Sequence, residues 1–324
     1  MSMVNKRFLV VALAAGVLAA CTLPSVGAAP LTGSRAQASP RAVVHPPRIG
    51  GCQVFPATNR WNQDVSKLPV RSDSASLVRT ISTTGGLTNL HPDFGGHGAY
   101  GIPFKLVQAN QKRFPIHYTA YGDESDPGPF PMPRNTPVEG GSDSHAIVLQ
   151  EGSCHLYELF AAHWNGSGWN AASGANWNLS SNKLRPLGWT SADAAGLPIF
   201  PGLVRWGEVH DGAVNHALRF TVEATQRGYI LPATHEASSS TDPRLPPMGL
   251  RLRLKASFSL APFHGESLVI LKALKKFGMI VADNGSSWYI TGAADPRWND
   301  NDLDQLKSVP GSAFEAVNTG PIHH

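Results

Sequence analysis

HAIVLQEGSCHLYELF, residues 145–160, contains the clearest strand pattern in the chain. Residues 146–150 and 154–162 are apolar runs, and Glu151 and Gly152 between them are typical of a tight turn. The segment therefore predicts a β-hairpin. A two-residue turn would place His145 directly opposite Glu158, at the end of an otherwise apolar face.

Outward from this hairpin, the chain reads as a series of short strands. We expect strands over 216–222, 228–231, 250–260 and 279–282. Apolar side chains at helical spacing predict one helix over 266–277, which Gly278 would end, and a second short helix over 301–306. High Gly and Pro contents, 32 and 26 residues, favour many turns. The predicted class is mainly β, an antiparallel β-sandwich or jelly roll with one or two peripheral helices.

The N-terminal 21 residues indicate export. Lys6 and Arg7 precede an apolar run over 8–20 that is too short to span a bilayer. Residues 18–21, Leu-Ala-Ala-Cys, resemble the lipobox of bacterial lipoproteins, and this resemblance implies acylation of Cys21 and attachment to a membrane. An ordinary secretory signal cut near residues 27–29 is the alternative. We expect a signal peptide over 1–21, a disordered tether over 22–50 and one β-rich domain over 51–320, in a periplasmic or extracellular protein.

The predicted export also bears on the pairing of the three cysteines in the chain. With Cys21 carrying lipid, Cys52 and Cys154 remain as an even pair in an oxidising compartment, which predicts a disulfide bond between them. Two separate buried thiols are the alternative. The net charge of +4 is spread along the chain. We therefore expect no nucleic-acid partner, whereas an anionic glycan or cell surface would suit this charge.

The predicted hairpin brings two ionisable residues of the apolar face together. His145 and Glu158 would lie side by side, and His216 is on the apolar face of the strand over 216–222. A carboxylate beside a histidine in a dry groove can act as a catalytic acid or base. The three side chains could also hold a divalent metal, with Asp143 as a further ligand. Partnered core residues are the plain alternative.

Two loops carry further acidic residues. Asp123, Glu124 and Asp126 lie in a Gly/Pro-rich loop, where they could bind calcium, place Glu124 at a cleft as a catalytic carboxylate, or form a solvated turn. Residues 283–288 follow an apolar run and read first as a turn and second as a functional loop. We therefore count Asp283 and Trp288, together with Arg219, as candidate substrate-binding residues.

Four tryptophans lie within 26 residues that are otherwise rich in Gly, Ser and Asn. A segment that is this polar does not easily bury four indole rings, and exposed aromatic side chains mark binding sites. Flat aromatic faces flanked by polar groups suit sugar rings, whereas the alternative is that the indoles anchor a long loop onto the sheet. The four candidates are Trp164, Trp169, Trp177 and Trp189.

Several stretches resemble a family of secreted, functionally uncharacterised bacterial proteins: 91–95 (HPDFG), 215–220 (NHALRF), 278–285 (GMIVADNG) and 295–300 (DPRWND). The resemblance covers most of the chain from Cys52 onward. It implies a shared fold and export, and it supplies no activity.

The leading functional prediction is an exported, glycan-cleaving enzyme that acts on a polysaccharide or cell-wall glycan. Glu158 or Glu124 would be the acid or base, with His145 and His216 orienting it. A non-catalytic glycan-binding protein or envelope lipoprotein is the first alternative. A metal-dependent hydrolase or oxygenase that uses His145, Glu158 and His216 is the second. No cofactor is expected, although a divalent metal would fit that second alternative.

Overall fold

The predicted hairpin is present in the computed structural model, which describes residues 45–92, 94–95 and 101–324. Strands β6 (Ala146–Gln150) and β7 (His155–Phe160) pair antiparallel, with Ile147 opposite Glu158. The predicted register, with His145 opposite Glu158, is wrong by two residues because the turn has four residues and not two. Gly152 and Cys154 both have positive φ in this turn, +76° and +52°. A shift of two keeps every side chain on its predicted face.

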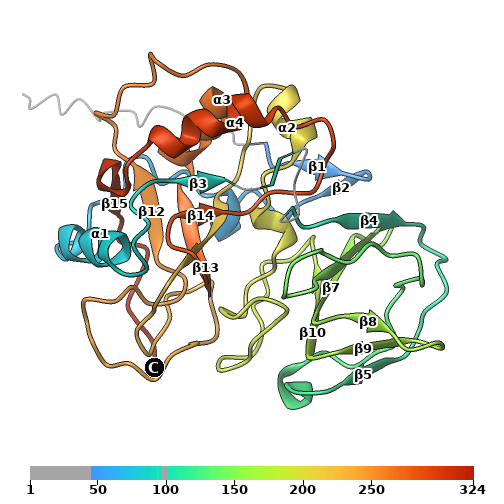
Figure 1. The fold of residues 1–324 in the computed structure, drawn as a ribbon. Helices are drawn as coiled ribbons and strands as arrows, with labels where there is room; N and C mark the ends of the chain where they lie inside the picture. The colour runs from blue at the N-terminus through green and yellow to red at the C-terminus, as the bar shows by residue number, and fades with distance from the viewer. Residues whose placement is uncertain (1–44, 93, 96–100) are drawn as a thin grey trace, which may run out of the picture. The chain divides into compact units, whose positions relative to one another are not determined.

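A four-stranded sheet extends from this hairpin in the order β10-β7-β6-β4. Strand β10 (Ser173–Asn178) pairs antiparallel with β7, and β4 (Phe104–Val107) pairs parallel with β6. A three-stranded sheet of β5 (Ile116–Tyr118), β9 (Trp169–Ala171) and β8 (His163–Trp164) lies beside it in Figure 1. Val148 and Tyr157 of one sheet and Trp169 of the other share a small hydrophobic core.

The second large sheet has six strands in the order β15-β12-β13-β11-β14-β3. Their bounds are β3 (His91–Pro92), β11 (Leu218–Val222), β12 (Arg251–Leu254), β13 (Met279–Asn284), β14 (Tyr289–Ile290) and β15 (Phe314–Ala316). Strand β11 runs parallel to β13, and β14 runs parallel to β3. The prediction of purely antiparallel sheets is therefore wrong, since parallel and antiparallel pairs are mixed. The mainly β class is confirmed, with 25% of residues in strands and 18% in helices.

Four α-helices accompany these sheets in the described residues (Figure 1). They are α1 (Ser74–Thr83), α2 (Trp206–His210), α3 (Gly265–Lys276) and α4 (Asp300–Leu303). Helix α3 packs on β12 and α4 and matches the predicted amphipathic helix. Gly278 follows it at φ +65°, as the prediction requires. Short 3-10 helices are η1 (Arg60–Asn62), η2 (Gly122–Glu124), η3 (Phe200–Gly202), η4 (Asp304–Ser308) and η5 (Gly311–Ala313).

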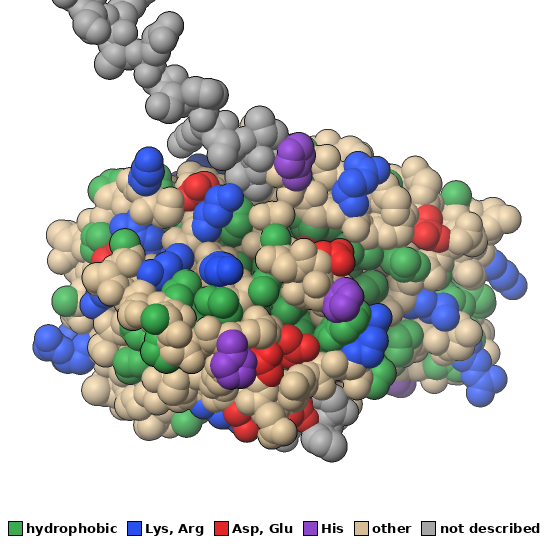
Figure 2. All heavy atoms as spheres, turned by 90° about the horizontal axis from the view of Figure 1, so that it is seen from above, with side chains coloured by type: hydrophobic (Ala, Val, Ile, Leu, Met, Phe, Trp, Pro, Cys, Tyr) green, Lys and Arg blue, Asp and Glu red, His purple; other side chains and the backbone are tan. Residues whose placement is uncertain are grey.

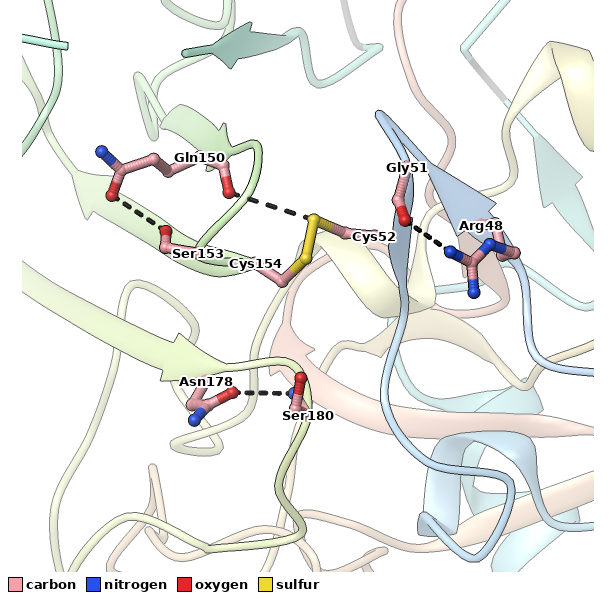
Figure 3. The surroundings of a disulfide bond; sticks show 8 residues. All are labelled: Arg48, Gly51, Cys52, Gln150, Ser153, Cys154, Asn178 and Ser180. Atoms are coloured by element: carbon pink, nitrogen blue, oxygen red, sulfur yellow. Dashed lines mark hydrogen bonds between the residues drawn. A yellow bond between two sulfur atoms is a disulfide. The ribbon is translucent and has the colours of Figure 1, made fainter. Parts of the chain in front are cut away.

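Cys52 and Cys154 form a disulfide bond, which confirms that prediction (Figure 3). Cys52 lies in β2 (Cys52–Gln53), which pairs with β1 (Arg48–Ile49). The bond therefore joins this small hairpin to the turn between β6 and β7. Strand β1 also occupies the end of the predicted tether, so residues 48–49 are part of the fold. Cys21, the predicted signal peptide and the tether up to residue 44 lie outside the described residues.

Figure 2 shows the molecule from the upper side of Figure 1. Lys and Arg side chains are spread over this face, and two histidine side chains lie beside a group of acidic side chains. None of the helices in the described part of the chain has both the length and the hydropathy needed to cross a bilayer.

Candidate functional site

A pocket with a volume of about 590 Å³ opens where β10 ends and the loop over 181–189 begins. We call it the aromatic pocket and define it by six of its lining residues: Asp126, His155, Asn176, Trp177, Lys183 and Trp189. This volume is in the range of small-molecule sites. Trp177 exposes only 6% of its surface, whereas Trp189 is half-buried, so Trp189 offers the larger aromatic surface to a ligand.

Arg185 holds the two indoles of this pocket in place. Its guanidinium carbon lies 5.6 Å from the centre of the Trp177 ring and 5.7 Å from that of Trp189. Its nitrogens donate to the Thr190 carbonyl at 2.7 Å, to Asp126 Oδ2 at 2.6 Å and to the Glu124 carbonyl at 2.7 Å. With the guanidinium bound on every side, the loop that carries Trp189 is fixed against η2.

Glu124, a predicted catalytic residue, contacts the loop that carries Trp189. Its Oε2 accepts a hydrogen bond from the Thr190 amide at 2.9 Å and is 3.8 Å from His235 Nε2. His235 Nδ1 donates to the Ala194 carbonyl at 2.7 Å, so in neutral His235 the Nε2 atom is the proton acceptor. The Glu124 and His235 side chains are 28% and 24% exposed. Glu124 is thus placed close to the aromatic pocket, with a histidine that sequence reasoning missed.

Three of the other predicted residues, Arg219, Asp283 and His145, meet in a second, largely buried region. Arg219 donates to both Asp193 carboxylate oxygens at 2.8 Å, to Asp283 at 3.1 Å and to the Thr291 hydroxyl at 2.8 Å. Asp193 is fully buried and Arg219 is 4% exposed. Burial, together with the charge of Asp193, raises the pKa of Asp283 to about 7. We call Arg219, Asp193, Asp283, Glu139 and His145 the buried charge cluster.

His145 belongs to this cluster through Glu139. Its Nδ1 is 2.5 Å from Glu139 Oε2, and its Nε2 donates to the Ala192 carbonyl at 3.0 Å. Burial alone would lower the pKa of His145, but the hydrogen bond and charge of Glu139 raise it overall. Both ring nitrogens are therefore donors to fixed acceptors, and His145 ties the loop at Ala192 to the start of β6.

Glu158 holds the same loop at its other end. Its carboxylate accepts from the Ile199 amide at 2.9 Å and from the Phe200 amide at 2.8 Å. Burial raises its pKa to about 7, and the electrostatic influence of His145 acts in the opposite direction. The side chain is 0% exposed, so a polysaccharide cannot contact it. Of the three roles that the sequence left open for Glu158, its position matches the partnered core carboxylate.

His216 lies in a different set of contacts. Its Nδ1 donates to the Ala217 carbonyl at 2.7 Å, and its Nε2 accepts from Arg205 at 2.9 Å. Burial would raise the pKa of Glu208, but the charge of Arg205, whose Nε is 2.6 Å from Glu208 Oε2, lowers it overall to about 2. The predicted strand over 216–222 begins only at Leu218, which places His216 before the sheet. Among the residues that the structure describes, no group of three His, Cys, Asp or Glu side chains could hold a metal ion.

The remaining tryptophans are packing residues. Trp169 is 1% exposed and donates from Nε1 to the Met132 carbonyl, and Trp164 packs edge-on against it. Trp288 is fully buried between Phe220 and Phe314. Neither Trp169 nor Trp288 has a free ring face, so burial contradicts the prediction of Trp169 as a sugar-stacking residue and of Trp288 as a substrate-binding residue. The anchoring alternative describes Trp169, whose ring fills the smaller core, and the Trp288 ring fills the larger core.

Sequence reasoning missed Asp193, Glu139, Arg185, His155 and His235. Arg185 carried a signal, since it lies between two of the four clustered tryptophans. Asp193 carried none, because it is in a loop without periodicity. Comparison of the chain with family models, with curated proteins and with solved structures finds no match.

Proposed function

We propose that this protein binds a glycan in the aromatic pocket. The observation that carries the proposal is the pair of indoles, Trp177 and Trp189, held around Arg185 at the edge of an open pocket with polar groups on its other sides. The C–H faces of a sugar are apolar and stack on an indole, while its hydroxyls need hydrogen-bond partners. A ring that is fixed before binding loses little conformational entropy on binding.

This proposal takes the binding alternative ahead of glycan cleavage by Glu158. A catalytic acid or base must reach the glycosidic bond, and the Glu158 carboxylate is buried and bound to two backbone amides. Export, the lipid anchor on Cys21 and a sandwich arrangement of the sheets accompany the proposal as predictions. A protein held at a cell surface would meet polysaccharides in that location.

The test is affinity electrophoresis of the full-length chain in gels that contain one polysaccharide each. Trp189→Ala should weaken binding about tenfold, because truncating a stacking aromatic removes about 1–3 kcal/mol. Trp206→Ala is the matched control, since Trp206 is also half-buried but lies on α2 outside the pocket. Equal retention of the Trp189 variant and the wild type, with both folded by circular dichroism, would refute the proposal.

Glycan cleavage remains a second candidate because of Glu124 and His235. These two partly exposed groups are 3.8 Å apart and lie next to Thr190, the residue after Trp189. If they transfer protons to a bound glycan, the wild type releases new reducing ends or unsaturated products and Glu124→Gln does not. An absence of product from a polysaccharide that demonstrably binds would remove this candidate and leave the binding proposal intact.

A further inference from the structure

We propose that the aromatic pocket selects an acidic glycan, a polymer whose sugars carry carboxylate or sulfate groups, and that Lys183 pairs with the anionic group. This inference rests on the proposed glycan binding and adds the substrate class. It follows from the charges that face the pocket from each element around it.

The charges of Asp126 and Arg185 cancel each other within the protein. Asp126 Oδ2 accepts from Arg185 at 2.6 Å and from the Asn176 amide at 2.8 Å. The other two printed donors of Arg185 bind backbone carbonyls. Arg185 and Asp126 therefore neutralise each other, and the guanidinium is occupied in holding the loop. Neither group leaves a net charge for a ligand to meet.

Lys183 is the cation that remains. It is exposed, it lines the aromatic pocket, and it also lines the smaller hollow next to it that Asn59 and Trp61 border. Within the described part of the chain its ammonium group has no ion-pair partner. Its backbone amide donates to Ser181 Oγ at 3.1 Å, which fixes the base of the side chain at the rim. Lys183, Arg185 and Asp126 together thus leave the pocket an excess of one positive charge.

The uncharged polar groups of the pocket also favour an anion. Asn178 Oδ1 accepts from the Ser180 amide at 2.8 Å (Figure 3), so the NH₂ group of Asn178 is left for a ligand. The side chains of Asn176 and His155 likewise have no hydrogen-bond partner among the described residues. These groups add N–H donors to the ammonium group of Lys183. Carboxylate and sulfate oxygens can accept from these NH₂ groups and can also form an ion pair with Lys183, which a neutral hydroxyl cannot do.

The test compares three polymers on the full-length protein: polygalacturonate, its fully methyl-esterified form, and dextran sulfate. The ester has the same sugar without the charge. Wild-type protein should bind polygalacturonate more tightly than the ester, and about 0.5 M NaCl should remove most of that difference. Lys183→Gln should lose about three- to fivefold in affinity for the acidic polymers and nothing for the ester. Lys67→Gln, which removes an exposed lysine elsewhere, should bind like the wild type.

Two results would overturn the inference: measurable and equal wild-type affinity for polygalacturonate and its ester, or unchanged affinity of Lys183→Gln for every acidic polymer that binds. Binding of dextran sulfate but not polygalacturonate would narrow the class to sulfated glycans, and the reverse would narrow it to uronates. Failure of the glycan-binding proposal looks different, because Trp189→Ala would then bind every polymer as the wild type does.

Discussion

Two arginines organise two contrasting regions of this protein. Arg185 lies between two indoles beside an open pocket, and its acidic partner Asp126 has a 27% exposed side chain. Arg219 lies in the interior, and its principal partner Asp193 is completely buried. Both guanidiniums are bound on several sides, yet only the first region offers surfaces to a ligand.

The contrast between the two regions shows that a shifted pKa does not by itself mark a functional site. Clusters of ionisable groups with shifted pKa values are usual at active sites, but networks of structural ion pairs shift them as well. In this protein Glu158, which is fully buried, and Asp283, whose side chain is 21% exposed, have raised pKa values, and they hold the loop over 190–200 and the end of β13. The aromatic pocket is the better candidate because it combines exposure with apolar and polar surfaces.

The strongest way to break this comparison is Arg219→Met. The change leaves the Asp193 carboxylate buried without its partner, so the free energy of unfolding should fall by about 3–5 kcal/mol. Chemical denaturation measures the loss, and glycan affinity below the unfolding transition should stay near the wild-type value. A loss smaller than about 1 kcal/mol would show that the cluster contributes little to the fold.

Arg185→Met should give the opposite balance. Methionine keeps an apolar contact between the indoles but cannot donate to Asp126 or to the two carbonyls. We expect a smaller stability loss of about 1–3 kcal/mol, since the partners are closer to solvent, together with loss of glycan binding. The two regions would not differ as described if this variant retained affinity while Arg219→Met lost it.

Glu158→Gln sharpens the comparison through pH. Native Glu158 has a pKa of about 7 and unfolded Glu158 about 4.5, so the native state holds the extra proton between these values. Wild-type stability therefore decreases as pH rises through this window, by up to about 3 kcal/mol from this group. Glutamine lacks this dependence and loses one amide hydrogen bond, about 1 kcal/mol.

Unfolding free energies measured from pH 5 to pH 8 should thus show the wild type and Glu158→Gln nearly equal at pH 5, with the variant the more stable protein by pH 8. Asp283 also titrates in this range, but it is present in both proteins and cancels in the difference. A wild type that gains stability relative to Glu158→Gln as pH rises would contradict the raised pKa of Glu158.

Much of the fold could be predicted because local signals agree with tertiary packing. The side chains of the hairpin strands lie on their predicted faces, helix α3 has apolar residues at helical spacing, and Gly278 ends this helix. The register failed because Ser153 and Cys154 belong to the turn, and a cysteine at positive φ has no clear signature. Helix α1 was missed because its Ser- and Thr-rich sequence has a weak helix propensity.

The site was harder to predict than the fold. Strand faces correctly grouped His145 with Glu158, but their partners Glu139, Asp193 and Ile199 lie in loops whose positions depend on tertiary contacts. Burial also gives a structural role to residues that look functional in the sequence, above all Trp288 and Glu158. Only the structure distinguishes Trp189, at the pocket, from Trp169, in a core.

The disulfide gives the chain a defined path for mechanical load. Cys154 directly precedes His155, which lines the aromatic pocket. Tension applied through the residues before Cys52 and resisted by a polymer in the pocket would pass across the sulfur–sulfur bond into β7. Residues 53–153 form a closed loop outside that path. A force on a polymer bound in the aromatic pocket would therefore not first stretch residues 53–153, which are about a third of the chain.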